Sequence, residues 1–220
     1  MSGAPRLAVV DYGVGNLRSA EKALQHVGAD ARLTADPATI SAADGVVVPG
    51  VGAFAGSVAA LHETGLAEAV RVAATAARDG SGVPFLGICV GLQLLYDGSE
   101  ESPDTPGLGV LAGTIERLSG PVKLPQMQWN RLLLDLPDHP LFTGLGPQPW
   151  CYFVHGYAAP IGPETIARCD YGGPVSAAVG TGRLVATQFH PEKSGRTGLA
   201  ILAAFAARCA EPSHVERLGV

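Results

Sequence analysis

The chain has 220 residues, of which 47% are hydrophobic and 16% charged, a composition that fits a folded globular protein and excludes a disordered chain. Its formal net charge of -5, with no dense Lys/Arg cluster, argues against a nucleic-acid partner. No apolar run is long enough to cross a bilayer, and residues 1–6 lead straight into a short strand-like run rather than a signal peptide, so we expect a cytoplasmic protein.

The first half of the chain alternates short β-branched runs with Ala-rich helical stretches. Such alternation is typical of βαβ units built around a parallel sheet. Strands are predicted at 7–11, 45–48 and 84–87, and helices up to about 27, at 53–62, at 66–78 and from 88 to about 96.

The second half predicts short strands separated by Gly, Pro and Asp turns. We expect these strands to form an antiparallel extension of the same sheet. No internal repeat and no linker divides the sequence, so we expect one domain over residues 1–220, with its core at about 6–209. The strands are predicted at 114–118, 131–134, 151–154, 166–169, 176–179 and 185–188.

A closing helix is predicted at about 197–209, because apolar residues recur there at helical spacing. The side chains expected to pack on the sheet are Leu199, Leu202, Phe205 and Ala206. The segment 96–108 contains two prolines among acidic residues and is expected to be a surface loop.

Cys89 lies between Gly87 and Gly91 where an apolar strand meets a helix. Small flanking residues permit the sharp, strained turn of a nucleophile elbow, which presents the central side chain above the sheet. The helix N-terminus would stabilise a thiolate there. Gln93, four residues further on, projects from the same helix face towards a substrate held over the sulfur. The alternative, a cysteine that only fills the core, is less consistent with the two glycines.

His190 and Glu192 follow the last predicted strand and are candidates for the base and its orienting acid. If Pro191 holds the segment extended, the two side chains point to the same side. Alone, the pair would more often be a surface pair, but with a cysteine elbow it predicts a Cys-His-Glu triad. His155 is a rival base; a lone histidine on an apolar strand is more often a hydrogen-bonded structural residue.

Acyl transfer also needs donors for an oxyanion. The strand at 45–48 leads into Gly50-Val51-Gly52, whose backbone can approach a ligand closely, and the amide of Val90 follows the nucleophile. The alternative for the glycine segment is a plain strand-to-helix turn.

The sequence predicts neither a cofactor nor a metal site. Residues 11–16 resemble a dinucleotide loop, but Arg18 stands where the third glycine is needed. The four cysteines have no C-x-x-C spacing and should be free thiols in a reducing compartment. They are Cys89, Cys151, Cys169 and Cys209.

The Gly-x-Cys-x-Gly-x-Gln elbow and the distant His-Pro-Glu together resemble class I glutamine amidotransferases. The segments 11–17, 49–54, 152–155 and 188–195 resemble, in order and spacing, the glutaminase subunits of imidazole glycerol phosphate synthases, and the resemblance spans almost the whole chain. It implies a flavodoxin-like α/β domain with a mostly parallel central sheet flanked by helices. It also implies hydrolysis of L-glutamine to glutamate and ammonia through a cysteine thioester.

The resemblance implies a partner as well: a separate cyclase subunit with a (β/α)-barrel fold, forming a heterodimer. That subunit would use the ammonia to convert PRFAR to imidazole glycerol phosphate and AICAR in histidine biosynthesis. Trp129, Asn130 and Lys193 match positions near the subunit interface. Ammonia released into neutral water becomes protonated and loses its nucleophilicity, so a glutaminase without a partner would waste its product.

The chain departs from the family pattern at a few places. Gln126 and Gln128 replace the usual His and Gly of a Pro-His-Met-Gly-Trp-Asn segment, and Gly156 replaces a small hydroxylated residue. The first two bear on the interface, and the third on a substrate or partner contact.

Three other functions fit parts of the pattern. One is a class I glutaminase serving pyridoxal phosphate, anthranilate or aminodeoxychorismate synthesis, against which the Asp-Tyr-Gly-x-Gly-Asn start argues. A second is a catalytically idle regulatory subunit, against which the intact Cys89, His190 and Glu192 argue. A cysteine peptidase is the third, and assays with peptides and with free glutamine would separate it.

Overall fold

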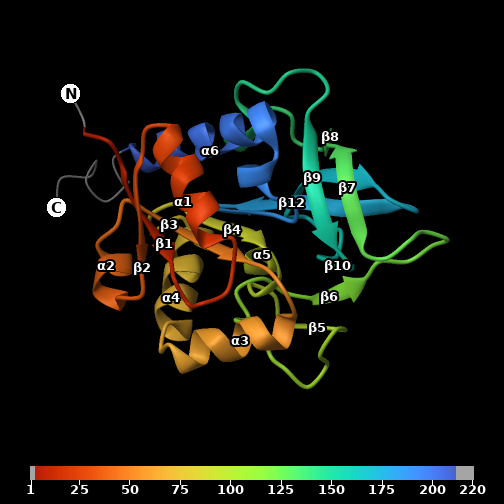
Figure 1. The fold of residues 1–220 in the computed structure, drawn as a ribbon, viewed down its shortest axis with the longest axis horizontal. Helices are drawn as coiled ribbons and strands as arrows, with labels where there is room; N and C mark the ends of the chain where they lie inside the picture. The colour runs from red at the N-terminus through yellow and green to blue at the C-terminus, as the bar shows by residue number, and fades with distance from the viewer. Residues whose placement is uncertain (1–2, 212–220) are drawn as a thin grey trace.

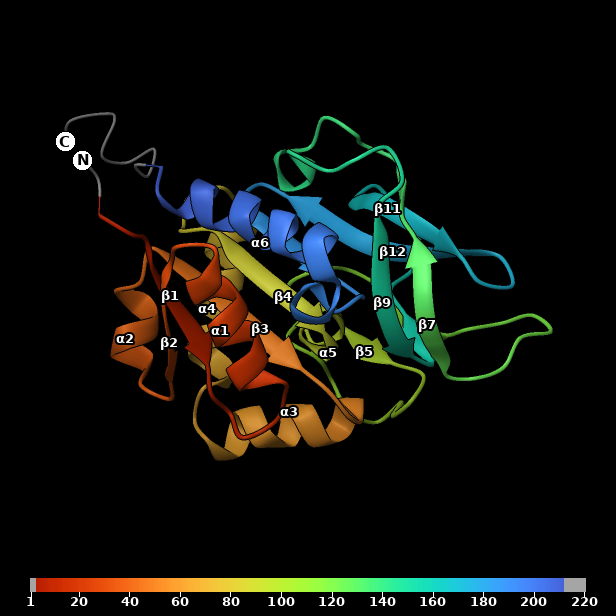
Figure 2. The same cartoon turned by 45° about the horizontal axis from the view of Figure 1, so that its top comes forward.

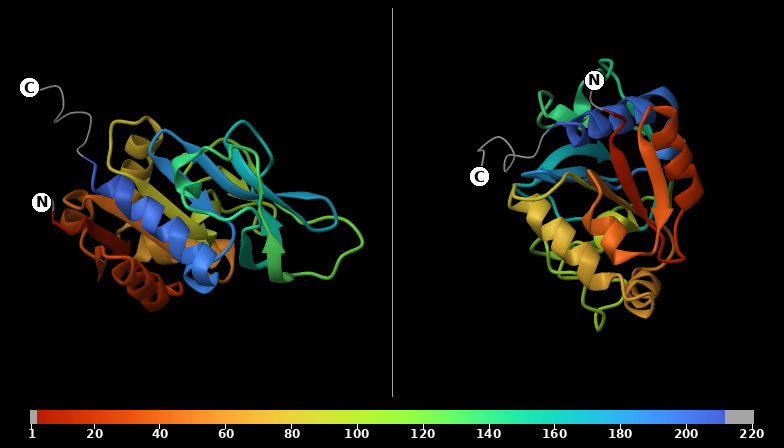
Figure 3. Two further views of the ribbon diagram at one scale, coloured as in Figure 1. Left: turned by 90° about the horizontal axis from the view of Figure 1, so that it is seen from above. Right: turned by 90° about the vertical axis from the view of Figure 1, so that its left-hand side faces the viewer.

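An eight-stranded sheet forms the centre of the protein, with strand order β2-β1-β3-β4-β13-β12-β11-β8. The structure is a computed structural model that describes residues 3–211; residues 1–2 and 212–220, the two ends of the expected domain, lie outside the described residues. Helices α1 and α6 cover one face of the sheet, and α3 and α4 cover the other (Figures 1 and 3).

The parallel half of the sheet agrees with the predicted alternation. Strands β1 to β4 are parallel to their neighbours, and β13 joins them beside β4. The elements of this half are β1 (Arg6–Val10), α1 (Leu17–His26), β2 (Asp30–Thr34), α2 (Pro37–Ser41), β3 (Gly45–Gly50), α3 (Phe54–Glu63), α4 (Ala67–Arg78), β4 (Phe85–Cys89), α5 (Val90–Gln93) and β13 (Leu184–Thr187).

Two of these elements, β2 and α2, are additional to the prediction. Strand β2 is the edge of the sheet and is mostly polar and partly exposed, so it lacks the apolar run that marks the inner strands. Helix α2 is short, but its start carries a recognisable signal. Asp36 accepts hydrogen bonds from the amides of Ala38 and Thr39, and Pro37 occupies the first turn.

The predicted antiparallel extension is only partly correct. Strands β8 (Leu133–Leu134), β11 (Thr165–Asp170) and β12 (Pro174–Thr181) continue the main sheet. The strand predicted at 185–188 was wrongly placed in this extension, because β13 lies beside β4 and is parallel to it. The remaining short strands form two smaller sheets (Figure 2). A three-stranded one contains β5 (Gly98–Ser99), β6 (Thr114–Arg117) and β10 (Tyr157–Ala158), and a two-stranded ribbon contains β7 (Gln126–Arg131) and β9 (Trp150–His155). Alternating polarity predicts a strand, but the strand's partner depends on distant residues.

The helix predicted to continue to about 96 is wrong in length, because α5 ends at Gln93. Beyond it, Leu94 and Leu95 form a buried turn, and the short strand β5 lies within the predicted loop at 96–108. Two short 3-10 helices, η1 (Pro140–Phe142) and η2 (Pro191–Lys193), interrupt the second half.

The closing helix is confirmed as α6 (Gly195–Cys209). It buries Leu202, Phe205 and Ala206, while Leu199 is only half-buried. Within residues 3–211, no helix is long and apolar enough to span a membrane.

Candidate active site

Three neighbouring parallel strands, β3, β4 and β13, bring the candidate residues to one edge of the sheet. Gly50, at the end of β3, pairs with Cys89 at the end of β4. Thr187, the last residue of β13, pairs with Ile88 and is followed three residues later by His190. Ligand sites of α/β sheets lie beyond the carboxyl ends of such strands.

Cys89 has the strained backbone of a nucleophile elbow. Its φ of 56° and ψ of -109° make it the one non-glycine residue with positive φ in the described chain. The flanking glycines are required by packing: a Cβ at Gly91 would collide with the carbonyl oxygen of Val48, and one at Gly87 would lie 2.7 Å from the carbonyl oxygen of Gly91. Because α5 has only four residues, its dipole supports a thiolate less than the longer predicted helix would.

His190 and Glu192 are brought together by η2 and not by an extended segment as predicted. Pro191 occupies the first position of this 3-10 turn, which suits its fixed φ. The Nδ1–H of His190 donates to Glu192 Oε1 at 2.8 Å, and both side chains are almost fully buried. The ring therefore holds its proton on Nδ1, which leaves Nε2 for the reacting groups.

Electrostatics favour a protonated His190. Burial lowers the pKa of the imidazole, but the nearby Cys89 sulfur and the Glu192 carboxylate outweigh burial and raise the pKa to about 9. His190 Nε2 has no partner within hydrogen-bonding geometry among residues 3–211. Gln188 Nε2 donates to Cys89 Sγ at 3.6 Å, a contact that the sequence did not predict.

Further residues hold the triad candidates in place, and sequence reasoning missed them. Asn16 Nδ2 donates to Glu192 Oε1 at 3.0 Å, which occupies the same carboxylate oxygen as His190. Ser194 Oγ donates to the His190 carbonyl oxygen at 2.6 Å and accepts from the amide of Tyr152 at 3.0 Å. The motif at 11–16 was noted in the sequence, but only the fold shows that Asn16 reaches residue 192.

A cavity of about 160 Å³ opens above the sulfur. It is lined by Cys89 and His190 together with Val51, Gly52, Val90, Gln93, Glu101, Val154, His155, Gly156 and Tyr157. Gly50 packs behind it, since a Cβ there would lie 2.8 Å from the amide nitrogen of Gly91. Gln93 is buried, and its Nε2 donates to the carbonyl of Tyr157 at 3.1 Å and to Gln188 Oε1 at 3.2 Å.

Two titratable cavity residues complete the site. His155 Nδ1–H donates to the Tyr157 carbonyl at 2.8 Å, as expected for a hydrogen-bonded histidine. Burial lowers its pKa to about 4, so at neutral pH its Nε2 is an unprotonated acceptor, and that atom is buried without a protein partner in the described chain. Glu101, which the sequence did not single out, accepts from the amide of Phe54 at 2.8 Å.

The candidate interface residues lie on and beside the β7–β9 ribbon. Trp129 is 48% exposed, Lys193 is exposed, and Asn130 Nδ2 donates to the carbonyl of Asp170 at 2.8 Å. A Cβ at Gly195, just after η2, would lie 3.9 Å from the ring of Trp129, so the ribbon adjoins the segment that carries the triad candidates.

The three departures from the family pattern differ in their surroundings. Gln126 is fully buried, and its Nε2 faces Cys169 Sγ at 3.9 Å, whereas Gln128 is exposed on the ribbon. A Cβ at Gly156 would meet nothing within 4 Å, so a small side chain would fit there without strain.

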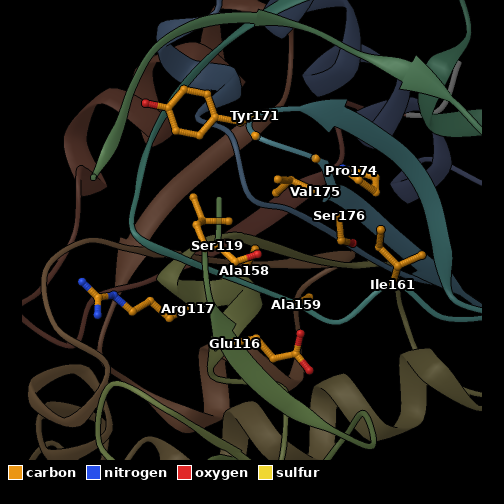
Figure 4. Close-up of a pocket in the computed structure, with 13 residues that line it drawn as sticks. Glu116, Arg117, Ser119, Ala158, Ala159, Ile161, Tyr171, Pro174, Val175 and Ser176 are labelled. Carbon is orange, nitrogen blue, oxygen red and sulfur yellow. The ribbon is translucent and has the colours of Figure 1, made fainter. Parts of the chain in front are cut away.

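A larger hollow of about 380 Å³ lies elsewhere, between β6, β10 and the β11–β12 hairpin (Figure 4). It shares no residue with the cavity above Cys89. The candidate site is therefore not identified by cavity size alone.

All four cysteines are free, as predicted, and all four are buried. Burial raises the pKa of Cys151 and of Cys169 to about 12, so these two thiols stay protonated at neutral pH. Within residues 3–211, no group of three or more His, Cys, Asp or Glu side chains could hold a metal ion.

Comparison with known proteins gives a consistent result. The family model "Glutamine amidotransferase class-I" matches residues 8–209. The chain is 50% identical to the imidazole glycerol phosphate synthase subunit HisH of Synechococcus elongatus, over 96% of each chain, and 48% identical to that of Symbiobacterium thermophilum, over 90% of this chain and 92% of the relative. A crystal structure described as a glutamine amidotransferase superposes with a TM-score of 0.69 at 23% identity, covering 91% of this chain and 98% of the other.

Proposed function

The chain belongs to the class I glutamine amidotransferase family, and we propose that it is the glutaminase subunit of an imidazole glycerol phosphate synthase, with Cys89, His190 and Glu192 as its catalytic triad. One observation carries the assignment of the triad: a cysteine on a strained elbow shares a cavity with a histidine whose other nitrogen is held by a buried glutamate. One amidotransferase domain accounts for the chain, with its core at about 6–209.

The reaction proceeds in two halves. The Cys89 sulfur attacks the carboxamide carbon of glutamine and forms a C–S bond, while the carbonyl oxygen takes up the negative charge. His190 then gives its Nε2 proton to the nitrogen, the C–N bond breaks, and ammonia leaves a thioester. Finally, His190 takes a proton from a water, the resulting hydroxide displaces the sulfur, and glutamate is released. Because the pKa of His190 is raised to about 9, the acid needed for the first half is already protonated at neutral pH.

Backbone amides of the turn Gly50-Val51-Gly52 and of Val90 are the proposed oxyanion donors. Support comes from their position: Val51, Gly52 and Val90 line the cavity, and Gly50 pairs with the nucleophile across the sheet. Backbone amides directed at the developing negative charge stabilise it in the transition state.

Gln93, Glu101 and His155 are proposed to bind the rest of the substrate. The Glu101 carboxylate suits the α-ammonium group of glutamine, and the unprotonated Nε2 of His155 accepts one hydrogen bond from the substrate. Gln93 closes the cavity floor, where its hydrogen bonds to Tyr157 and Gln188 hold it still.

The partner is the cyclase subunit, for which the family resemblance indicates a (β/α)-barrel, and both belong in the cytoplasm. The ribbon face, which we define as Met127, Trp129 and Trp150, is the proposed contact, with Asn130 and Lys193 beside it. These three apolar side chains are 62%, 48% and 47% exposed on one two-stranded ribbon. Clustered exposed aromatic and Met side chains are typical of interfaces.

Replacing Cys89 by Ser tests the function. Glutamine-dependent synthesis by the two-subunit complex should fall at least about a thousandfold, because the weaker nucleophile cannot form the thioester. Synthesis from added ammonium should persist, because the cyclase chemistry lies in the partner. If both activities disappear while the complex still forms, the assigned role of Cys89 is wrong.

A further inference from the structure

The hydroxyl of Tyr12 forms a hydrogen bond to β3 just beyond the last residues at which β1 and β3 pair. The last paired residues are Val9 and Val47. Two residues further along β3, the carbonyl oxygen of Pro49 faces the β1 side, and the Tyr12 hydroxyl donates to it at 2.8 Å. A side-chain O–H thus replaces the backbone donor that the neighbouring strand no longer supplies.

This contact is tightly enclosed. Tyr12 is 1% exposed, and a Cβ at Gly50 would lie 2.8 Å from its hydroxyl oxygen. On the other side, a Cβ at Gly15 would lie 3.0 Å from the Pro49 oxygen. Burial, with a smaller effect from Cys89, raises the pKa of Tyr12, so the hydroxyl keeps the proton that it donates to Pro49.

The direction of the Pro49 carbonyl determines the direction of the next amide. A trans peptide is planar, with its C=O and N–H pointing to opposite sides. Since β3 lies between β1 and β4, a carbonyl held towards β1 directs the Gly50 N–H towards the β4 backbone, with which Gly50 is paired, and so fixes the point at which the turn at 50–52 begins. Without the hydroxyl, the Pro49 oxygen would be a buried acceptor with no donor, and the turn could rotate to find one.

We propose that Tyr12 is a positioning residue that holds the Pro49–Gly50 peptide, and with it the turn at 50–52, in the orientation needed for the oxyanion. This rests on the proposed function, in which that turn supplies the oxyanion donors. Tyr12 does not touch the reacting atoms; it acts through the backbone. The loop at 11–16 then supports both parts of the site, because Asn16 holds Glu192.

The test is Tyr12→Phe in the full chain, assayed with its cyclase partner on L-glutamine. Tyr171→Phe is the matched control, because Tyr171 also donates its hydroxyl to a backbone carbonyl, that of Lys123 at 2.6 Å, far from Cys89 in the sequence and outside the cavity. Each preparation is also treated with iodoacetamide, which alkylates the Cys89 thiolate without passing through an oxyanion. Turnover is expressed per alkylatable Cys89, so that a partly unfolded preparation does not bias the result.

We expect Tyr12→Phe to lower kcat about tenfold, with KM and the alkylation rate within about twofold of the unmodified protein. Tyr171→Phe should change none of the three. An unchanged kcat overturns the proposal, and so does a parallel loss of turnover and of the alkylation rate, which would indicate general disruption of the elbow. If the unmodified complex does not hydrolyse glutamine, the proposed function is wrong. This outcome differs from failure of the Tyr12 proposal, in which the unmodified complex is active and Tyr12→Phe is equally active.

Discussion

The elbow edge of the sheet and the β7–β9 ribbon are built on opposite principles. Every residue of β3 and β4 is buried, and glycines allow the backbones of β3, β4 and α5 to touch. In β7, only Gln126 is buried, and apolar side chains project into solvent. The elbow edge buries its apolar side chains within the chain, whereas the ribbon exposes apolar side chains of the kind that another protein covers.

The two regions are nevertheless joined through backbone contacts. The amide of His190 donates to the carbonyl of Tyr152 on β9 at 3.0 Å, and Ser194 links the same two segments. A shift of the ribbon on partner binding would therefore reach His190, the proposed catalytic base, directly. The comparison shows that the proposed nucleophile lies on fully buried backbone, whereas the proposed base adjoins an exposed ribbon.

The largest effect is expected at the elbow, from Gly91→Ala. The new Cβ would overlap the Val48 carbonyl oxygen, which is backbone and cannot move aside. We expect the free energy of unfolding to fall by roughly 4 kcal/mol and glutaminase activity to disappear. Denaturant unfolding measures the change in the free energy of unfolding. Gly156→Ala is the control, since its Cβ enters open space; equal losses in both variants would contradict the packing argument.

A second effect follows from the raised pKa of His190. Its folded pKa of about 9 exceeds the ordinary value of 6.5, so its protonation contributes stability fully below pH 6.5 and loses it as the pH rises to 9. The stability difference between the unmodified protein and His190→Gln should therefore shrink by roughly 3 kcal/mol between pH 6.5 and 9. Urea unfolding at several pH values checks this.

His155, on the ribbon strand β9, should show the opposite sign. Its folded pKa of about 4 lies below 6.5, so its contribution is complete above pH 6.5 and is lost as the pH falls towards 4. The difference in free energy of unfolding between the unmodified protein and His155→Gln should shrink by a similar amount, but as the pH falls from 6.5 to 4. The same slope for both histidines would show that the two environments have been misassigned.

The smallest effect on stability, but a clear one on binding, is expected for Trp129→Ala on the ribbon face. The side chain is 48% exposed, so the free energy of unfolding should change by less than about 1 kcal/mol. Affinity for the cyclase subunit should fall about thirtyfold, as for an aromatic interface anchor. Titration calorimetry measures it. Val72→Ala on α4, 52% exposed on another surface, should leave affinity unchanged.

The sequence alone predicted the parts of this protein that depend on neighbours in the chain. The buried strands, the elbow glycines and the closing helix all have local patterns, because burial on both faces requires continuous apolar residues and a sharp turn requires small ones. The fold class could therefore be predicted from the alternation of strands and helices and from the family resemblance, and the candidate triad from Cys89, His190 and Glu192 in their local settings.

Only the tertiary structure decided what depends on distant contacts. It placed β7 and β9 in a separate ribbon, ended α5 at Gln93, replaced the extended His-Pro-Glu segment by a 3-10 turn, and brought Asn16 to Glu192 and Tyr12 to Pro49. A hydrogen bond between residues separated by 37 or 176 positions leaves no periodic signal in the sequence. Such contacts depend on the spatial order of the strands in the sheet, which local patterns do not encode.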